Sequence, residues 1–156
     1  MYIKTKLRYN KSLFIGFFIF LLVILLAVFS PYLTKYDPLK IDVVNRLQLP
    51  NKEHLLGTDE LGRDVFTRLL YGTKISISVG LVSVSIALLL GIPLGLFSAY
   101  YGKIVDSVIM RFMDALAAFP AILLALAILS ILGPSIHNAM IAIGIVYLPA
   151  FSRVIR

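Results

Sequence analysis

The chain has 156 residues, of which 60% are hydrophobic and 15% charged, whereas soluble domains average about 45–50% apolar and about 25% charged residues. This composition excludes an ordinary soluble enzyme and predicts an all-helical integral membrane protein. The chain contains no cysteine, which excludes disulfides and thiolate metal sites. The net charge of +7 arises from basic residues that flank apolar stretches, so we attribute it to a lipid bilayer and expect no nucleic acid partner.

A first membrane-spanning helix is predicted around the apolar run from Leu13 to Phe29, because no charged residue occurs between Lys11 and Lys35. With its flanks, this run is long enough to cross about 30 Å of hydrocarbon. The basic residues before it resemble the start of a signal peptide. The run is too long for a signal-peptide core and no small-residue cleavage motif follows, so we expect a retained anchor.

Three more spans are predicted further along the chain. The second is Ile75–Phe97, which is followed by two tyrosines suited to a membrane interface. A long window without charged residues then follows, interrupted by a Gly-Pro pair, and we interpret it as a helical hairpin of Ala115–Leu132 and Ser135–Ser152. Gly133 is expected to cap the first helix of the hairpin and Pro134 to lie in the first turn of the second.

The distribution of charge predicts the orientation of a multi-pass protein in the cell membrane. Four spans place both termini on one side, and the positive-inside rule places the N-terminus in the cytoplasm. The N-terminal arm has four basic residues and no acidic one: Lys4, Lys6, Arg8 and Lys11. The long segment between the first and second spans is extracytoplasmic in this arrangement. It has seven basic and six acidic residues between Thr34 and Lys74. The expected organisation is an arm and first helix (1–34), an extracytoplasmic loop (35–74) and a three-helix domain (75–156).

The outer loop contains the sequence GTDELGRD, from Gly57 to Asp64, which has the glycine spacing of a phosphate-binding loop. Arg63 and Asp64 occupy the positions where such a loop requires Lys and Ser or Thr. Two further carboxylates within the motif would repel phosphate, and no strand precedes it. We therefore reject a nucleotide-binding loop.

The same segment is better interpreted as a short amphipathic helix. Thr58 or Asp59 would cap its N-terminus, Asp64 and Arg68 would form an ion pair one turn apart, and Gly72 would end it. Its apolar stripe would consist of Leu61, Val65, Phe66, Leu69 and Leu70. Such a helix would lie along the outer interface or against the bundle, although a solvated helix without a function fits the pattern equally well.

The predicted spans two to four contain no ionisable residue apart from His137, which falls at an outer turn. Charges within the membrane usually mark proton relays and ion pathways, so the sequence disfavours a proton-coupled carrier. No pair of groups suited to hydrolysis or metal binding occurs at membrane depth. We expect neither an enzyme nor a bound cofactor or metal, and we interpret His54 and His137 as loop residues.

Small residues recur every three or four positions along the second span: Ser76, Gly80, Ser83, Ala87, Gly91 and Gly95. Such a face lets helices approach closely in lipid, where no hydrophobic effect drives them together. A similar set occurs in the third span: Ala117, Ala121 and Ala125. Three prolines are expected to kink their spans or leave a carbonyl without a donor: Pro93, Pro120 and Pro149.

Three segments carry a family resemblance: HLLGTDELGRDVFTRLLYGTKISISVG (54–80), GIPLGLFSAYYGKIVDSVIMRFMD (91–114) and AIGIVYLPAFSRVIR (142–156). They closely resemble the dipeptide/oligopeptide/nickel family of ABC importer permeases, specifically its second (C-type) subunit. The residues of the outer loop that carry this signature are Gly57, Thr58, Asp59, Gly62, Arg63 and Asp64. The resemblance implies that residues 75–156 form part of an ABC transmembrane type-1 domain.

The resemblance also implies partners and a function. A permease of this kind forms part of a pathway for peptides, or for nickel or another small solute. Its partners would be a second permease subunit, two cytoplasmic ATPase subunits and an extracytoplasmic substrate-binding protein. In the family, a cytoplasmic coupling loop with an E-A-A motif follows the position of Arg156, so we interpret this sequence as an N-terminal portion. The alternatives are a truncated, non-functional permease and a non-transporting membrane scaffold.

Overall fold

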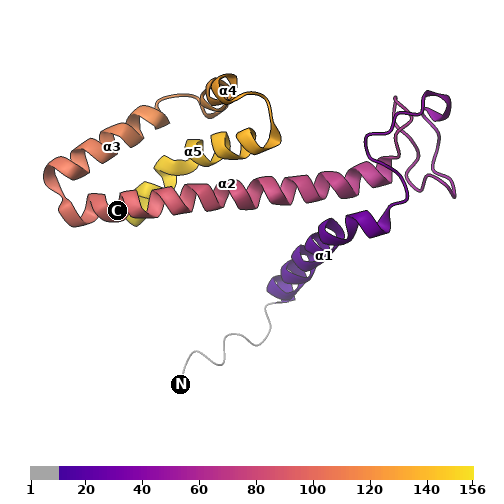
Figure 1. The fold of residues 1–156 in the computed structure, drawn as a ribbon. Coiled ribbons are helices and arrows are strands. Elements are labelled where there is room, and N and C mark those ends of the chain that lie inside the picture. Colours follow the sequence, from indigo (N-terminus) through magenta and orange to yellow (C-terminus); the bar gives the residue numbers. More distant parts are fainter. Residues whose placement is uncertain (1–10) are drawn as a thin grey trace. The chain divides into compact units, whose positions relative to one another are not determined.

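The computed structural model describes residues 11–156, so the arm residues Lys4, Lys6 and Arg8 lie outside the described part. The described chain consists of helices (Figure 1): α1 (Lys11–Leu33), the short 3-10 helix η1 (Val43–Asn45), α2 (Val65–Tyr101), α3 (Lys103–Ala117), α4 (Ala121–Leu132) and α5 (Ile136–Ile155). Within this part, extended pairing is limited to one isolated bridge between Thr58 and Asp64. The predicted all-helical membrane class is confirmed.

Three of the described helices, α1, α2 and α5, are long and apolar enough to cross a membrane, and α3 and α4 together make a fourth candidate. In α1, only 6% of the apolar window is buried, as expected for a helix that faces lipid. The 37 residues of α2 rise about 55 Å at 1.5 Å per residue. Because this exceeds the roughly 30 Å of hydrocarbon, α2 extends beyond the apolar layer.

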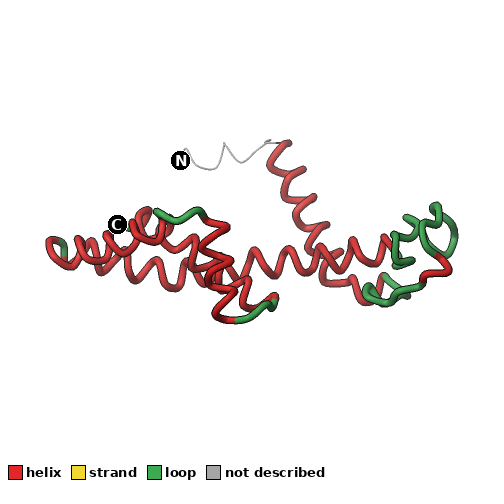
Figure 2. The backbone as a smooth tube through the Cα atoms, turned by 90° about the horizontal axis from the view of Figure 1, so that it is seen from above, coloured by secondary structure: helices red, strands yellow, loops and turns green. Residues whose placement is uncertain are grey.

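The chain divides into two compact units between Ile77 and Ser78, inside α2. The first unit contains α1, the first turns of α2 and the loop between them. This loop contains the irregular backbone of the first unit (Figure 2). In the second unit, α5 packs against α4 and α3 and touches the later part of α2 through close glycine contacts. The α5 helix therefore lies between α2 and the two helices α3 and α4 (Figure 1).

The prediction of a separate amphipathic helix that begins at Thr58 or Asp59 and ends at Gly72 is wrong. Residues 57–64 are loop, α2 begins at Val65, and the helix continues through Gly72 to Tyr101. The helix that contains the predicted second span thus begins ten residues before Ile75. The helix does not begin at Thr58 or Asp59 because the loop backbone there contacts an earlier segment. It does not end at Gly72 because a single glycine in a long helix costs only about 1 kcal/mol.

The hairpin between α4 and α5 turns at Gly133, which caps the C-terminus of α4. The side chain of Ser135 caps α5 by accepting a hydrogen bond from the Asn138 N–H at 3.1 Å. The Asn138 amide group closes the turn by donating to the carbonyls of Leu132 (2.7 Å) and Gly133 (2.9 Å). Pro134 precedes the cap, so its predicted place in the first turn of the helix is wrong.

The predicted third span, Ala115–Leu132, is not one straight helix, and it breaks at Pro120, one of the three prolines expected to kink their spans. Helix α3 ends at Ala117, α4 begins at Ala121, and the two are bent by 94°. Pro120 lies at the break with an extended ψ of 128°, and a proline disfavours helical geometry in the residue before it. By contrast, α2 and α5 continue past Pro93 and Pro149, where the missing proline N–H removes one helical hydrogen bond.

Candidate functional site

The outer loop is an ordered structure in which two segments, residues 42–48 and 57–65, lie side by side. Backbone hydrogen bonds join Leu47 N–H to the Asp59 carbonyl (3.1 Å) and Thr58 N–H to the Gln48 carbonyl (3.1 Å). The Thr58 hydroxyl donates to the Asn45 carbonyl at 2.5 Å and accepts from the Gln48 N–H at 2.8 Å. Thr58, predicted as part of the family signature, therefore fastens the two segments together.

Asp59 is the main acceptor of this loop. One carboxylate oxygen accepts hydrogen bonds from the backbone N–H groups of Leu61 (2.8 Å) and Arg63 (2.9 Å). The other accepts from the Arg63 Nε at 2.8 Å and also contacts the Arg68 guanidinium. Partial burial raises the pKa of Asp59, but these hydrogen bonds outweigh it and hold the pKa well below its usual value.

Gly57 and Gly62 are required by the geometry of the loop. Both have positive φ angles, +76° and +73°, which side chains other than that of glycine rarely tolerate. A Cβ atom at Gly57 would overlap the Gln48 carbonyl, and one at Gly62 would overlap the Asp42 carbonyl. Neither position can hold a larger residue without displacing the neighbouring backbone.

A buried pair joins this loop to the start of α2. His54 Nδ1 lies 2.9 Å from Asp64 Oδ1, and the Tyr36 ring lies 4.8 Å from the His54 ring. The second Asp64 oxygen caps α2 by accepting from the Thr67 N–H at 2.7 Å. Burial raises the pKa of Asp64, but hydrogen bonds from Thr67 and His54 lower it overall. The predicted ion pair between Asp64 and Arg68 is wrong, because Arg68 contacts Asp59.

In the second unit, small residues allow α2 and α5 to approach closely; we call this contact the α2–α5 seam. A Cβ added at Gly91 would lie 3.0 Å from the Phe151 Cβ, and one at Gly95 would lie 2.6 Å from the Ser152 carbonyl oxygen. On α5, a Cβ at Gly144 would lie 2.8 Å from Ile86. Glycine at these three positions lets the two backbones pack at a distance that alanine would prevent.

Other members of the predicted small-residue face differ in their surroundings. Ala87 is fully buried, and the Ser83 hydroxyl donates to the Met140 carbonyl of α5 at 3.0 Å. Gly80 has no atom within 4 Å of the place where a Cβ would lie, so it stands outside the seam. The alanines of the third span are exposed or half-buried in this chain: Ala117, Ala121 and Ala125.

Two ion pairs tie the end of α5 to α3. Arg153 lies 2.7 Å from Asp114, and Arg156 lies 2.5 Å from Asp106. Asp106 also accepts a hydrogen bond from the Ser98 hydroxyl of α2 at 2.5 Å. Sequence analysis missed these aspartates as partners, because each pair joins residues 39 or 50 positions apart and no local pattern signals it.

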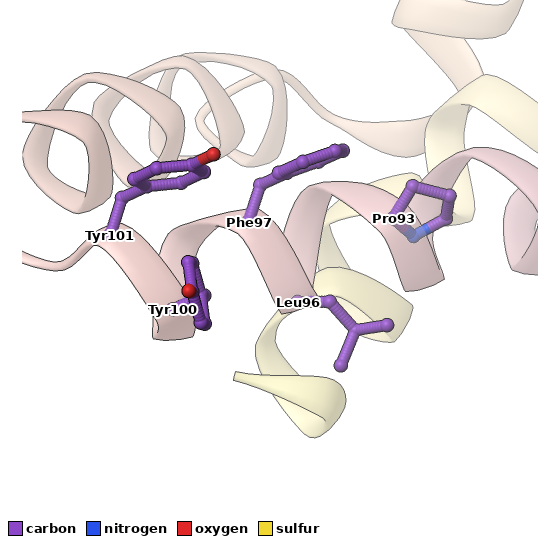
Figure 3. A pocket seen from close by; sticks show the side chains of 5 residues that line it. All are labelled: Pro93, Leu96, Phe97, Tyr100 and Tyr101. Carbon is purple, nitrogen blue, oxygen red and sulfur yellow. The ribbon is translucent and has the colours of Figure 1, made fainter.

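An apolar groove runs along the last turns of α2, with a volume of about 480 Å³. Figure 3 shows the residues that line it: Pro93, Leu96, Phe97, Tyr100 and Tyr101. The rings of Phe97 and Tyr101 stack at 6.2 Å, on the same side of the helix (Figure 3). The groove offers apolar contact area but no convergent polar group.

The chemistry of these sites is that of packing and ion pairing. Among residues 11–156, no three His, Asp or Glu side chains gather closely enough to hold a metal ion. His54 is part of the buried pair in the outer loop, and His137 is exposed in the first turn of α5. The residues identified are therefore suited to holding helices and a loop in place.

Comparison with known proteins gives two family matches. Residues 3–50 match the N-terminal transmembrane domain of oligopeptide transport permease C. Residues 91–156 match the binding-protein-dependent transport system inner membrane component. These models describe transport permeases rather than enzymes.

Individual relatives agree with these matches. The dipeptide transport system permease protein DppC of Alkalihalophilus pseudofirmus is 48% identical over 97% of this chain and 50% of its own length. The DppC protein of Haemophilus influenzae is 37% identical over 96% of the chain and 52% of its own length. A probable D,D-dipeptide transport system permease protein of Escherichia coli is 45% identical over 88% of this chain and 46% of its own length. The chain spans about half the length of the curated relatives it matches.

Proposed function

Because this chain belongs to the C-type oligopeptide and dipeptide permeases of binding-protein-dependent ABC importers, we propose that it forms part of a pathway that carries peptides across the cell membrane. The observation that carries this proposal is the order of the two family matches, at residues 3–50 and 91–156. The relatives' names favour peptides as the cargo. The partners would be a second permease subunit, two cytoplasmic ATPase subunits and an extracytoplasmic substrate-binding protein.

The proposed orientation has a cytoplasmic N-terminus and an extracytoplasmic segment at residues 35–74. It is supported by basic residues at the start of α3 and at the end of α5, which the positive-inside rule places in the cytoplasm: Lys103, Arg153 and Arg156. The proposed domain boundary at residues 74 and 75 lies near the division between the two compact units at Ile77 and Ser78. In this arrangement, residues 75–156 form the core of the permease.

Accessibility labelling tests this orientation, because the chain has no natural cysteine. Leu49 in the outer loop and Val154 near the end of α5 are both 83% exposed, so they form a matched pair. We expect a membrane-impermeant maleimide to label L49C in intact cells and V154C only after permeabilisation. The reverse result would invert the topology.

The structure suggests how such a chain would contribute to transport. Alternating access moves parts of a transporter against one another around a central site, and parts that move must be rigid. The α2–α5 seam supplies close packing through Gly91, Gly95 and Gly144. The ion pairs of Arg153 and Arg156 add α3 to this group. We propose that α2, α3 and α5 move as one body when partner ATPases drive the cycle.

Two measurements test the transport role. We expect ATPase subunits to co-purify with the tagged protein from its native membrane in mild detergent. We also expect vesicles prepared from that membrane to take up a labelled dipeptide only when ATP is supplied. A membrane scaffold predicts no ATPase partner, and a secondary carrier predicts uptake that follows an ion gradient and withstands ATP depletion. The intact mass of the native protein should be measured alongside, to identify the chain that is tested.

A further inference from the structure

A small cavity in the first unit lies between the end of α1, the outer loop and the first turn of α2. Its volume is about 150 Å³. Its polar lining includes Lys35, Tyr36, Lys52, Glu53, Asp64 and Thr67. The remaining wall is mostly apolar. Neither the family matches nor the names of the relatives assign a ligand to this place.

The hydroxyl of Thr67 indicates that the cavity holds a polar group. Thr67 is only 1% exposed, and its Oγ1 atom makes no hydrogen bond of normal geometry among the described residues, although this side chain helps to lower the pKa of Asp64. Elsewhere, Thr34 and Thr73 satisfy their hydroxyls with the carbonyl four residues earlier, at 3.0 and 2.8 Å. For Thr67 that carbonyl belongs to Arg63, which lies outside the helix and accepts the N–H of Asp59. A buried hydroxyl without a partner is destabilising, so a polar occupant would stabilise this site.

The charges around the cavity define the kind of occupant. Both oxygens of Asp64 are already engaged, by His54 and by the Thr67 N–H. The side chains of Lys35, Lys52 and Glu53 form no ion pair within residues 11–156. Besides the Asp64 carboxylate, which pairs with His54, the cavity lining therefore offers two lysines and one glutamate without an ion pair among the described residues, with the threonine hydroxyl at its buried wall.

We propose that this cavity binds a small zwitterion, a molecule with a carboxylate and an ammonium group a few bonds apart. Lys35, Lys52 and the Thr67 hydroxyl bind the carboxylate, and Glu53 binds the ammonium group. The volume of about 150 Å³ equals that of about five waters at about 30 Å³ each. A cavity of this size admits an amino acid as small as glycine, and its volume lies below the roughly 300 Å³ of the smallest drug-sized pockets. The proposal does not depend on the transport role.

Three probes of nearly equal size test the proposal: glycine, acetate and methylammonium. Each carries C–H protons, so saturation-transfer NMR can detect its binding to the full chain in lipid nanodiscs. We expect glycine to bind with a dissociation constant on the order of 1 mM, because five non-hydrogen atoms limit the affinity. Acetate and methylammonium should bind at least about tenfold more weakly, since each lacks one of the two charges.

Variants of the cavity wall assign the site. T67V should weaken glycine binding about tenfold by removing one hydrogen bond to a charged group, whereas T67S keeps the hydroxyl and should preserve binding. K52Q should also weaken binding. The matched control is K40Q, because Lys40 is an exposed lysine of the same loop that does not line the cavity.

Three results would overturn the proposal. Equal binding of acetate and glycine would show a simple anion site. Equal loss in K40Q and K52Q would show non-specific attraction to the basic loop. Absence of glycine binding in a chain whose loop amides retain their native chemical shifts would show a cavity that contains only water. Because none of these measurements involves transport, failure here is distinguishable from failure of the permease assignment.

Discussion

Substitution of Gly95 by alanine tests the α2–α5 seam most directly. The added methyl group would lie 2.6 Å from the Ser152 carbonyl oxygen and 2.9 Å from the Ile155 Cβ. The first neighbour is backbone, so no change of rotamer relieves the overlap. Such overpacking costs about 1–3 kcal/mol, partly offset by the gain of up to about 1 kcal/mol from replacing glycine in a helix. We expect a net destabilisation of about 1–2 kcal/mol.

The matched control is Gly80→Ala in the same helix. Gly80 has nothing within 4 Å of the added carbon, so this variant keeps only the gain in helix propensity of up to about 1 kcal/mol. The two variants should differ by about 2 kcal/mol, or about 30-fold in the unfolding equilibrium. Reversible unfolding in mixed detergent micelles, followed by circular dichroism and tyrosine fluorescence, measures this difference. Equal stability of G95A and G80A would refute the seam as a close-packed contact.

Three further predictions concern the outer loop and the end of α5. Asp59→Asn removes the carboxylate on which the loop converges, so protection of its amides from hydrogen exchange should fall at neutral pH. Folding lowers the pKa of Asp59, so the stabilisation from its carboxylate is complete above the unfolded pKa of about 3.9 and is lost as the pH falls further. D59N should lack this acid dependence. An unchanged acid transition in D59N would contradict the role of Asp59. Gly62→Ala, with its methyl group placed against the Asp42 carbonyl at a positive φ, should destabilise the loop by about 2 kcal/mol or more, seen as faster proteolysis between residues 42 and 63; unchanged cleavage would disprove the constraint. Arg153→Gln breaks an exposed ion pair with Asp114 and should cost no more than about 1 kcal/mol, with an effect that shrinks at high salt; a larger, salt-independent loss would show that the pair is desolvated.

Features of the fold that depend on local signals could be predicted from the sequence. The apolar run of α1 and the turn at Gly133 are marked by residues that lie next to one another in the chain. The break between α3 and α4 also has a local signal, the Phe119-Pro120 dipeptide, because the residue before a proline avoids helical geometry. The sequence therefore predicts a kink at Pro120, and the structure bends by 94° there.

Features that depend on distant residues could not be predicted. Thr58 and Asp59 have the chemistry of helix caps, but their hydrogen bonds reach back to residues 45–48 and forward to Arg63 and Arg68. That pairing competes with helix formation and moves the start of α2 to Val65. Similarly, nothing near Asp106 or Asp114 identifies the arginines of α5 as partners. Family resemblance located the signature residues, but it did not give their contacts.

The break between α3 and α4 has a consequence for hydration. A helix end leaves carbonyl and N–H groups without intrahelical partners, and only two of these carbonyls, those of Asp114 and Leu116, are taken up by Ala118 and Phe119. In hydrocarbon, each such group left unsatisfied would cost several kcal/mol. The connecting residues are exposed in this chain, so a bend at membrane depth would need water or the polar surface of another protein beside it. A solvent-accessibility probe attached at the connecting residues tests this, because contact with hydrocarbon alone would give no water signal.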